Sequence, residues 1–134
     1  MLDRAPRPTL DKLTREQMIA EFGETGVQNP AVVDLITLDK ASDTVILVMM
    51  ERRPWDAARE QFKQIEEKLN RYMGYVLDGF LVEQYPPYKG KSVQIRLDCA
   101  EAPHGEAVRF VEAMTHATES YGIHFSIAVR PPAS

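Results

Sequence analysis

The stretch from Trp55 to Gly79 carries apolar side chains that alternate between spacings of three and four residues. The members of this stripe are Trp55, Ala58, Phe62, Ile65, Leu69, Tyr72 and Val76. Because residues three and four apart are neighbours on a helix surface, the stripe predicts one amphipathic helix, opened by Pro54 and closed by Gly79. Such a helix is about 37 Å long, which predicts that it organises the packing of the whole chain.

The composition is that of a single soluble globular domain. The chain has 134 residues, a hydrophobic fraction of 44% and a net charge of −4. This charge argues against nucleic acid and against an anionic membrane surface as partners. The longest apolar run, Val45–Met50, is too short to span a membrane. The single Cys99 and an N-terminus without an apolar signal segment favour a cytoplasmic location, and no motif implies a cofactor.

Strand and helix patterns alternate along the rest of the chain. Ala31–Asp39 and Thr44–Met50 flank a short polar turn and predict a β-hairpin. Ser92–Cys99 and Ile123–Val129 alternate apolar and polar residues, which predicts two half-buried strands. Ala107–Tyr121 repeats the helical stripe, so a second helix separates these strands.

The fold class that follows is α+β, a two-layer sandwich. A four-stranded mixed sheet in the order ββαβαβ carries two helices on one face, because each later helix returns the chain across the sheet. Residues 31–130 form this domain, and residues 1–30 form an N-terminal extension with a short helix over 14–22. We expect residues 80–91 to be a connection that starts extended. The pattern leaves the order of the strands in the sheet open.

Two apolar surfaces lack an evident cover in this arrangement. The second strand is apolar on both faces, with Leu47 and Met49 on one of them, and the helix segment Tyr72–Leu77 is apolar nearly all round. The interface candidates are therefore Leu47, Met49, Tyr72, Met73, Tyr75 and Leu77. The N-terminal helix could cover the strand and the loop Phe80–Tyr88 could fold back on the helix segment, or a second copy or a partner could cover them. The leading hypothesis is a non-catalytic protein-interaction or dimerisation module, with a homodimer as the expected assembly.

A polar cluster over residues 98–106 supplies the alternative hypothesis, a small hydrolase or transferase. Cys99 would be the nucleophile and His104 its base, in the loop from Asp98 to His104. The competing interpretation places Cys99 in the core, because it continues the inward side of its strand, and assigns the loop carboxylates to a helix start. We predict no metal site, since the histidines and acids lack the usual ligand spacing.

Charged residues on the outward faces of the later strands could instead bind a small charged ligand. Arg96, Asp98 and His124 share the predicted open face, and Glu101 and His104 follow in the adjoining loop. Such alternation is also typical of a solvated sheet face, so both interpretations remain open.

Several segments together resemble a family of small bacterial proteins known only as a domain of unknown function. The segments are VVDLITLDK, MMERRPW, EEKLNRYMGYVLDGFLVEQYP and GKSVQIRLDC, which cover about residues 30–99. The resemblance implies a shared fold and brings no reaction, cofactor or catalytic residue.

Overall fold

The structure, a computed structural model, describes residues 26–29, 33–56 and 59–130 of the chain. The helix predicted over residues 14–22 lies outside the described residues, as does most of the predicted N-terminal extension. Within the described ranges, no helix is long and apolar enough to cross a membrane.

A mixed sheet of four strands forms the base of the molecule, with the strands side by side in the order of the sequence. The elements are β1 (Leu35–Asp39), β2 (Thr44–Glu51), α2 (Arg59–Leu77), α3 (Phe80–Gln84), the 3₁₀ helix η1 (Pro86–Tyr88), β3 (Ser92–Cys99), α4 (Glu106–Glu119) and β4 (His124–Val129). β1 and β2 form an antiparallel hairpin, whereas β2, β3 and β4 are parallel to one another. The predicted α+β class and mixed sheet are confirmed, and the strand order is now known.

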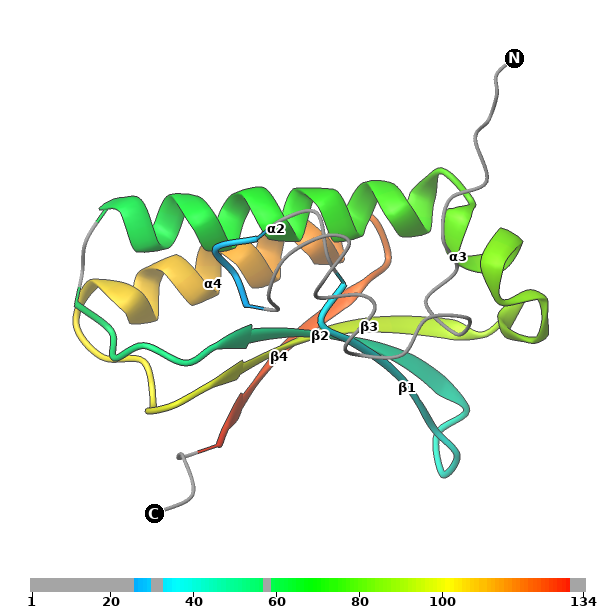
Figure 1. Cartoon of the computed structure of the whole chain (residues 1–134), viewed down its shortest axis with the longest axis horizontal. Coiled ribbons are helices and arrows are strands. Elements are labelled where there is room, and N and C mark those ends of the chain that lie inside the picture. The colour runs from blue at the N-terminus through cyan, green and yellow to red at the C-terminus, as the bar shows by residue number, and fades with distance from the viewer. Residues whose placement is uncertain (1–25, 30–32, 57–58, 131–134) are drawn as a thin grey trace.

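The core lies between the sheet and the two long helices, which run side by side over one sheet face (Figure 1). Leu47, Ile95 and Phe125 are register neighbours on three adjacent strands, and each is at most 2% exposed. Above them, the rings of Phe62 in α2 and Phe110 in α4 stack with their centroids 4.6 Å apart. The apolar stripes of both helices therefore meet the inward side of the alternating strands in one core.

The chain turns at Gly79, after the end of α2. Gly79 has a φ of +87°, in the left-handed region that glycine adopts at little cost, and α3 follows directly. The prediction that the connection starts extended is therefore wrong. The burial of Leu81, which is 1% exposed, explains the short helix, because one helical turn places this side chain in the core.

β1 begins later than the predicted strand Ala31–Asp39, because Asp34 makes other contacts. Its carboxylate accepts hydrogen bonds from the backbone N–H of Gly26 and of Met50, both at 2.8 Å. Its own N–H donates to the Tyr72 hydroxyl at 2.8 Å, and that hydroxyl donates to the carbonyl of Val48 at 2.7 Å. The start of β1 is thus fixed by α2 and β2, and strand pairing begins at Leu35.

The sheet face away from α2 and α4 is less open than the sequence predicts. Ile46 and Val48 point to this face, in register with Gln94 and Arg96, yet they are only 8% and 0% exposed. Since these side chains are buried within a single chain, this face offers a partner little apolar area from β2.

Candidate functional site

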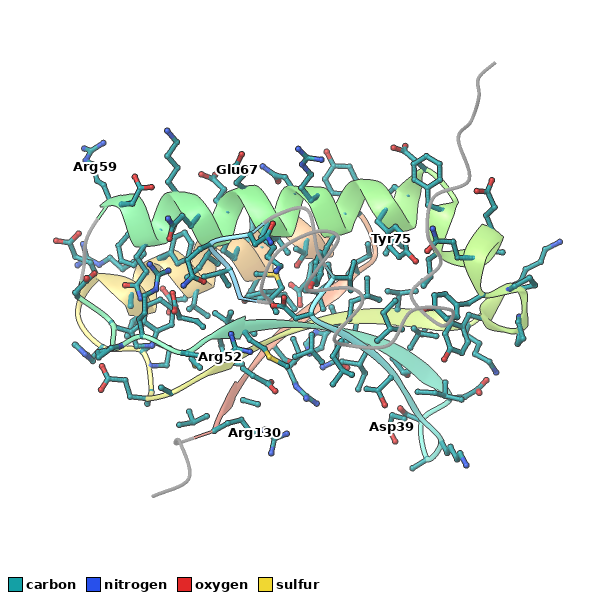
Figure 2. All side chains as sticks on the ribbon, in the orientation of Figure 1. Asp39, Arg52, Arg59, Glu67, Tyr75 and Arg130 are labelled. Carbon is teal, nitrogen blue, oxygen red and sulfur yellow. The ribbon has the colours of Figure 1, made fainter. Side chains whose placement is uncertain are left out.

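A cavity of about 410 Å³ lies where the three parallel strands end. Its lining comes from the ends of β2 and β3 and from the residues that follow β2, β3 and β4: Met50, Glu51, Arg52, Asp98, Cys99, Ala100 and Arg130. The carboxyl edge of a sheet with crossover helices is the place where ligands of such folds usually bind. This cavity is therefore the candidate site, and the two arginines of its lining, Arg52 and Arg130, are labelled in Figure 2.

Glu51 is a buried carboxylate whose hydrogen-bonding capacity is filled. Arg53 donates to it through its backbone N–H at 2.9 Å and through Nε and Nη2 at 2.9 and 2.7 Å. Gln61 of α2 adds a bond from Nε2 at 3.1 Å. The hydrogen bond to Glu51 raises the pKa of Arg53, so the guanidinium remains charged. Glu51 thus holds the turn after β2 and has little capacity left for a ligand.

Asp98 is also paired, on the sheet face away from the helices. Arg96 donates to its two carboxylate oxygens from Nε at 2.6 Å and from Nη2 at 3.2 Å. Arg130 also lies near this carboxylate, with Nε 3.7 Å from Oδ2. The structure therefore brings together the sequence-predicted residues Arg96 and Asp98, as an ion pair at the rim of the cavity.

Cys99 forms part of the cavity wall as an apolar group. It is 1% exposed, and its thiol donates a weak hydrogen bond to the carbonyl of Ala128, with 3.7 Å between sulfur and oxygen. Burial, together with the nearby charge of Asp98, raises the pKa of the thiol to about 11. The thiolate is the nucleophilic form of cysteine, so this thiol is inert at neutral pH.

The side chain of Arg52 lies between the cavity and the segment 26–29. Its Nη2 is 3.1 Å from the sulfur of Met50, and its Nη1 lies so close to Gly26 that a Cβ there would be 3.2 Å away. The same segment is held by Lys68, whose ammonium donates to the carbonyls of Gly26 and Asn29 at 2.6 and 2.9 Å. A third bond, to Asp34 at 2.7 Å, completes a fully buried ion pair behind the rim.

Glu101 and His104, which were predicted as binding residues, make contacts that hold two parts of the chain together. Glu101 accepts a hydrogen bond from the backbone N–H of Trp55 at 3.0 Å, and its carbonyl accepts another from the Trp55 indole at 3.0 Å. His104, exposed, lies 3.2 Å from the same Glu101 carboxylate. These contacts tie the loop after β3 to the chain before α2.

His124 is separated from the other candidates. It pairs in register with Gln94 at the amino end of β4, whereas Asp98 pairs with Ala128 near the carboxyl end. Its Nδ1 is 3.7 Å from Glu119, at the end of α4. His124 therefore lies at the opposite end of the strand from the cavity.

The six interface candidates are mostly buried within one chain. Leu47 and Met49 face the helices and are 0% exposed, and Tyr72 and Met73 are also buried. Tyr75 is half-buried and its hydroxyl donates to Gln84 of α3 at 2.6 Å. Leu77 alone among the six is strongly exposed, at 50%. The sequence identified these residues as apolar, but the core and α3 cover most of them.

Arg52 and Arg130 were not singled out by the sequence pattern, although one signal pointed to them. Each directly follows a strand that crossover helices make parallel to its neighbour, and ligands of such sheets usually bind at the carboxyl ends of the strands. The strand order was needed to place all three carboxyl ends at one edge. Within the described ranges, no group of three or more histidine, cysteine or acidic side chains could hold a metal ion.

Comparison with known proteins assigns no chemistry to this fold. No curated protein and no solved structure matches the chain significantly. One family model matches, over residues 25–131, and its description is a family of unknown function, DUF6572. Since this match covers most of the chain and the whole of the described sheet, the protein belongs to the DUF6572 family.

Proposed function

We propose that this protein is a non-catalytic interaction module that binds a carboxylate-bearing ligand in the cavity at the carboxyl ends of β2, β3 and β4. The observation that carries the proposal is the set of charged groups at this cavity. Two guanidinium groups, those of Arg52 and Arg130, line it, and its two carboxylates, Glu51 and Asp98, are bound by Arg53 and Arg96.

The two carboxylates are already neutralised from outside the cavity. Arg53 binds Glu51, and Arg96 binds Asp98, which Arg130 also approaches at 3.7 Å. Arg52 and Arg130 place two guanidinium groups at the rim of the cavity. A planar guanidinium suits the two oxygens of a carboxylate, because both can be bound at once.

The apolar part of the wall favours a carboxylate attached to carbon over a bare inorganic anion. Met50, Cys99 and Ala100 line the cavity beside the arginines, and none of the three carries a charged group. Pockets that combine an apolar wall with a few polar anchors are typical of small-ligand sites. A short aliphatic carboxylate, free or at the end of a peptide, matches both features.

The residues of the alternative enzyme hypothesis are engaged in other ways. Cys99 is a neutral buried thiol, and Glu101 holds Trp55, with His104 in contact with that same glutamate. These contacts support binding over nucleophilic catalysis in the loop from Asp98 to His104.

The test is an NMR or calorimetric titration of the full chain with succinate, with inorganic phosphate, and with a short alanine peptide that has either a free or an amidated C-terminus. We expect succinate or the free-acid peptide to perturb residues of the cavity, and the arm that binds more tightly identifies the source of the carboxylate. Arg52→Gln and Arg130→Gln should each weaken binding by about tenfold or more, because a hydrogen bond to a charged group contributes about 1.5–3 kcal/mol.

Arg59→Gln is the matched control, since Arg59 is exposed at the start of α2 and outside the cavity lining. It should leave the affinity unchanged. The proposal is wrong if no carboxylate perturbs the cavity up to about 50 mM, a concentration well above the range of specific sites. It is equally wrong if phosphate binds as well as succinate, or if the Arg59 variant weakens binding as much as the other two.

A further inference from the structure

Of the two carboxylates that line the cavity, only Asp98 has hydrogen-bonding capacity left for a ligand. The side chain of Glu51 is 0% exposed, and it accepts three hydrogen bonds from Arg53 and one from Gln61. Asp98 accepts one hydrogen bond on each oxygen, both from Arg96, and its side chain is 17% exposed. Because an ionised carboxylate offers about four acceptor positions, Asp98 can accept a further donor from the cavity.

The guanidinium of Arg130 lies beside this carboxylate at more than hydrogen-bond distance. Its Nε is 3.7 Å from Oδ2 of Asp98, and the Arg130 side chain is 61% exposed. A donor group of a ligand can therefore reach Asp98 while an acceptor group of the same ligand reaches Arg130. Opposite charges at this spacing suit a small ligand that carries both a carboxylate and a cationic donor.

The hydrogen bonds beyond the strand ends place Arg52, Ala100 and Arg130 in one row across the sheet. The N–H of Ala100 donates to the carbonyl of Glu51 at 3.1 Å. The N–H of Arg130 donates to the carbonyl of Cys99 at 2.7 Å. These bonds continue the parallel register of β2, β3 and β4 by one residue. Since neighbouring strands are about 4.8 Å apart, the backbones of the two arginines are about 10 Å apart, and only the methyl group of Ala100 separates them.

The charge and the size of the cavity favour a small ligand without net charge. The lining contains two guanidinium groups, of Arg52 and Arg130, and two carboxylates, of Glu51 and Asp98. A ligand with two negative charges would place one of them near Asp98, whereas a zwitterion offers each sign a partner. The volume of about 410 Å³ is near the lower end of the range of small-molecule sites, about 300–1,000 Å³.

We infer that the ligand of this cavity is a free α-amino acid with an aliphatic side chain, which rests on the proposed carboxylate site and adds a second anchor to it. The carboxylate binds Arg130 and Arg52, and the ammonium donates to Asp98. In an α-amino acid one carbon atom separates the two charged groups, so they can contact Arg130 and Asp98 at the same time. The aliphatic side chain packs against the apolar wall, which includes Met50 and Ala100.

Calorimetric titration of the full chain with L-leucine and two analogues tests each anchor separately. Isocaproate is leucine without its amino group, and leucinamide is leucine without its carboxylate. We expect leucine to bind about tenfold or more tighter than either analogue, because each analogue loses a hydrogen bond between charged groups. Leucine should also bind more tightly than succinate or the free-acid alanine peptide, neither of which has an ammonium beside its carboxylate.

The outcomes separate this inference from the proposed carboxylate site. If isocaproate, succinate or the free-acid peptide binds as tightly as leucine, the amino acid inference is wrong and the carboxylate site stands. If leucinamide binds as tightly as leucine, or if neither leucine nor any other carboxylate binds up to about 50 mM, both are wrong.

Asp98→Asn removes the anchor of the ammonium and keeps the shape of the side chain. It should weaken the binding of leucine by about tenfold or more, yet bind isocaproate at least as tightly as the wild type does, because a negative charge beside the carboxylate is gone. Asp43→Asn is the matched control, since Asp43 precedes β2 at the end away from the cavity and pairs with Lys91 at 2.6 Å. It should leave both affinities unchanged.

Equal weakening of leucine and isocaproate by Asp98→Asn, or an equal effect of Asp43→Asn on leucine, would overturn the inference. Circular dichroism of each variant shows whether it is folded. The titrations of the wild-type chain decide the inference even where Asp98→Asn does not fold.

Discussion

Replacement of Lys68 by methionine tests how the rim of the cavity is held. The Lys68 ammonium is fully buried and donates three hydrogen bonds, to the carbonyls of Gly26 and Asn29 and to the carboxylate of Asp34, at 2.6, 2.9 and 2.7 Å. Burial lowers the pKa of Lys68, and the nearby charge of Asp34 opposes that shift. Methionine preserves much of the side-chain volume but leaves three acceptors without their donor, one of them a buried carboxylate.

We expect Lys68→Met to lower the free energy of unfolding by about 3–5 kcal/mol, the usual cost of breaking a buried ion pair from one side. Urea unfolding of the full chain, followed by circular dichroism, measures this change. Lys63→Met in the same helix is the control, since Lys63 is exposed and its replacement should cost less than about 0.5 kcal/mol.

A double-mutant cycle with Asp34→Asn identifies the source of the loss. Once the carboxylate is neutral, Lys68→Met should cost less, with a coupling energy of about 1–3 kcal/mol. Costs for Lys68→Met and Lys63→Met that agree to within about 1 kcal/mol, or a coupling near zero, would refute the reasoning.

Three further predictions concern the thiol, two glycines and the helix–helix contact. The pKa of Cys99 is raised from 9.0 to about 11, so the neutral thiol stabilises the fold fully below pH 9 and this stabilisation, about 2–3 kcal/mol, is lost as the pH rises toward 11. Wild-type stability should therefore fall more steeply over that range than that of Cys99→Ala, and parallel curves would contradict the assignment. Gly79→Ala should cost about 1–2 kcal/mol because its φ is +87°, whereas Gly74→Ala inside α2, with its nearest neighbour 3.8 Å from the new methyl group, should stabilise by about 0.5–1 kcal/mol in the same urea assay. Phe110→Ala removes the ring stacked on Phe62 and should cost about 2–4 kcal/mol by urea unfolding, and a cost below 1 kcal/mol would show that this stack does not hold α4 in place.

The periodic parts of the sequence predicted the corresponding elements because burial determines them. The alternation over Ser92–Cys99 became β3 with the same bounds, and the stripe that contains Phe62 and Ile65 became α2. The failures were at residues whose side chains satisfy other backbone groups. Asp34 lies within the predicted strand Ala31–Asp39, yet its carboxylate binds two backbone N–H groups and so delays the start of β1.

The cavity was harder to anticipate because it depends on long-range pairing. Asp98 was recognised as the end of a strand, but Arg52 and Arg130 join it only because β2 and β4 lie on either side of β3. Apolar residues of α2 were easy to recognise, whereas which of them stay exposed depends on α3, and Tyr75 is bonded to that helix. Local patterns thus predicted the apolar faces of the helices and strands, and the topology determined which of those apolar residues face solvent.

The ion pairs around the cavity are best explained by the way they hold the backbone in position. A buried pair such as Asp34–Lys68, or a partly buried one such as Glu51–Arg53, often adds no more stability than apolar residues of the same volume would. Their hydrogen bonds are directional, however, and they hold the backbone on both sides of Arg52: Glu51 binds the N–H of Arg53, and Lys68 binds the segment 26–29 that Arg52 contacts. A guanidinium held in this way loses less conformational freedom when an anion binds, so more of the interaction energy appears as affinity. The same bonds that add little to stability therefore favour a binding role for this edge of the sheet.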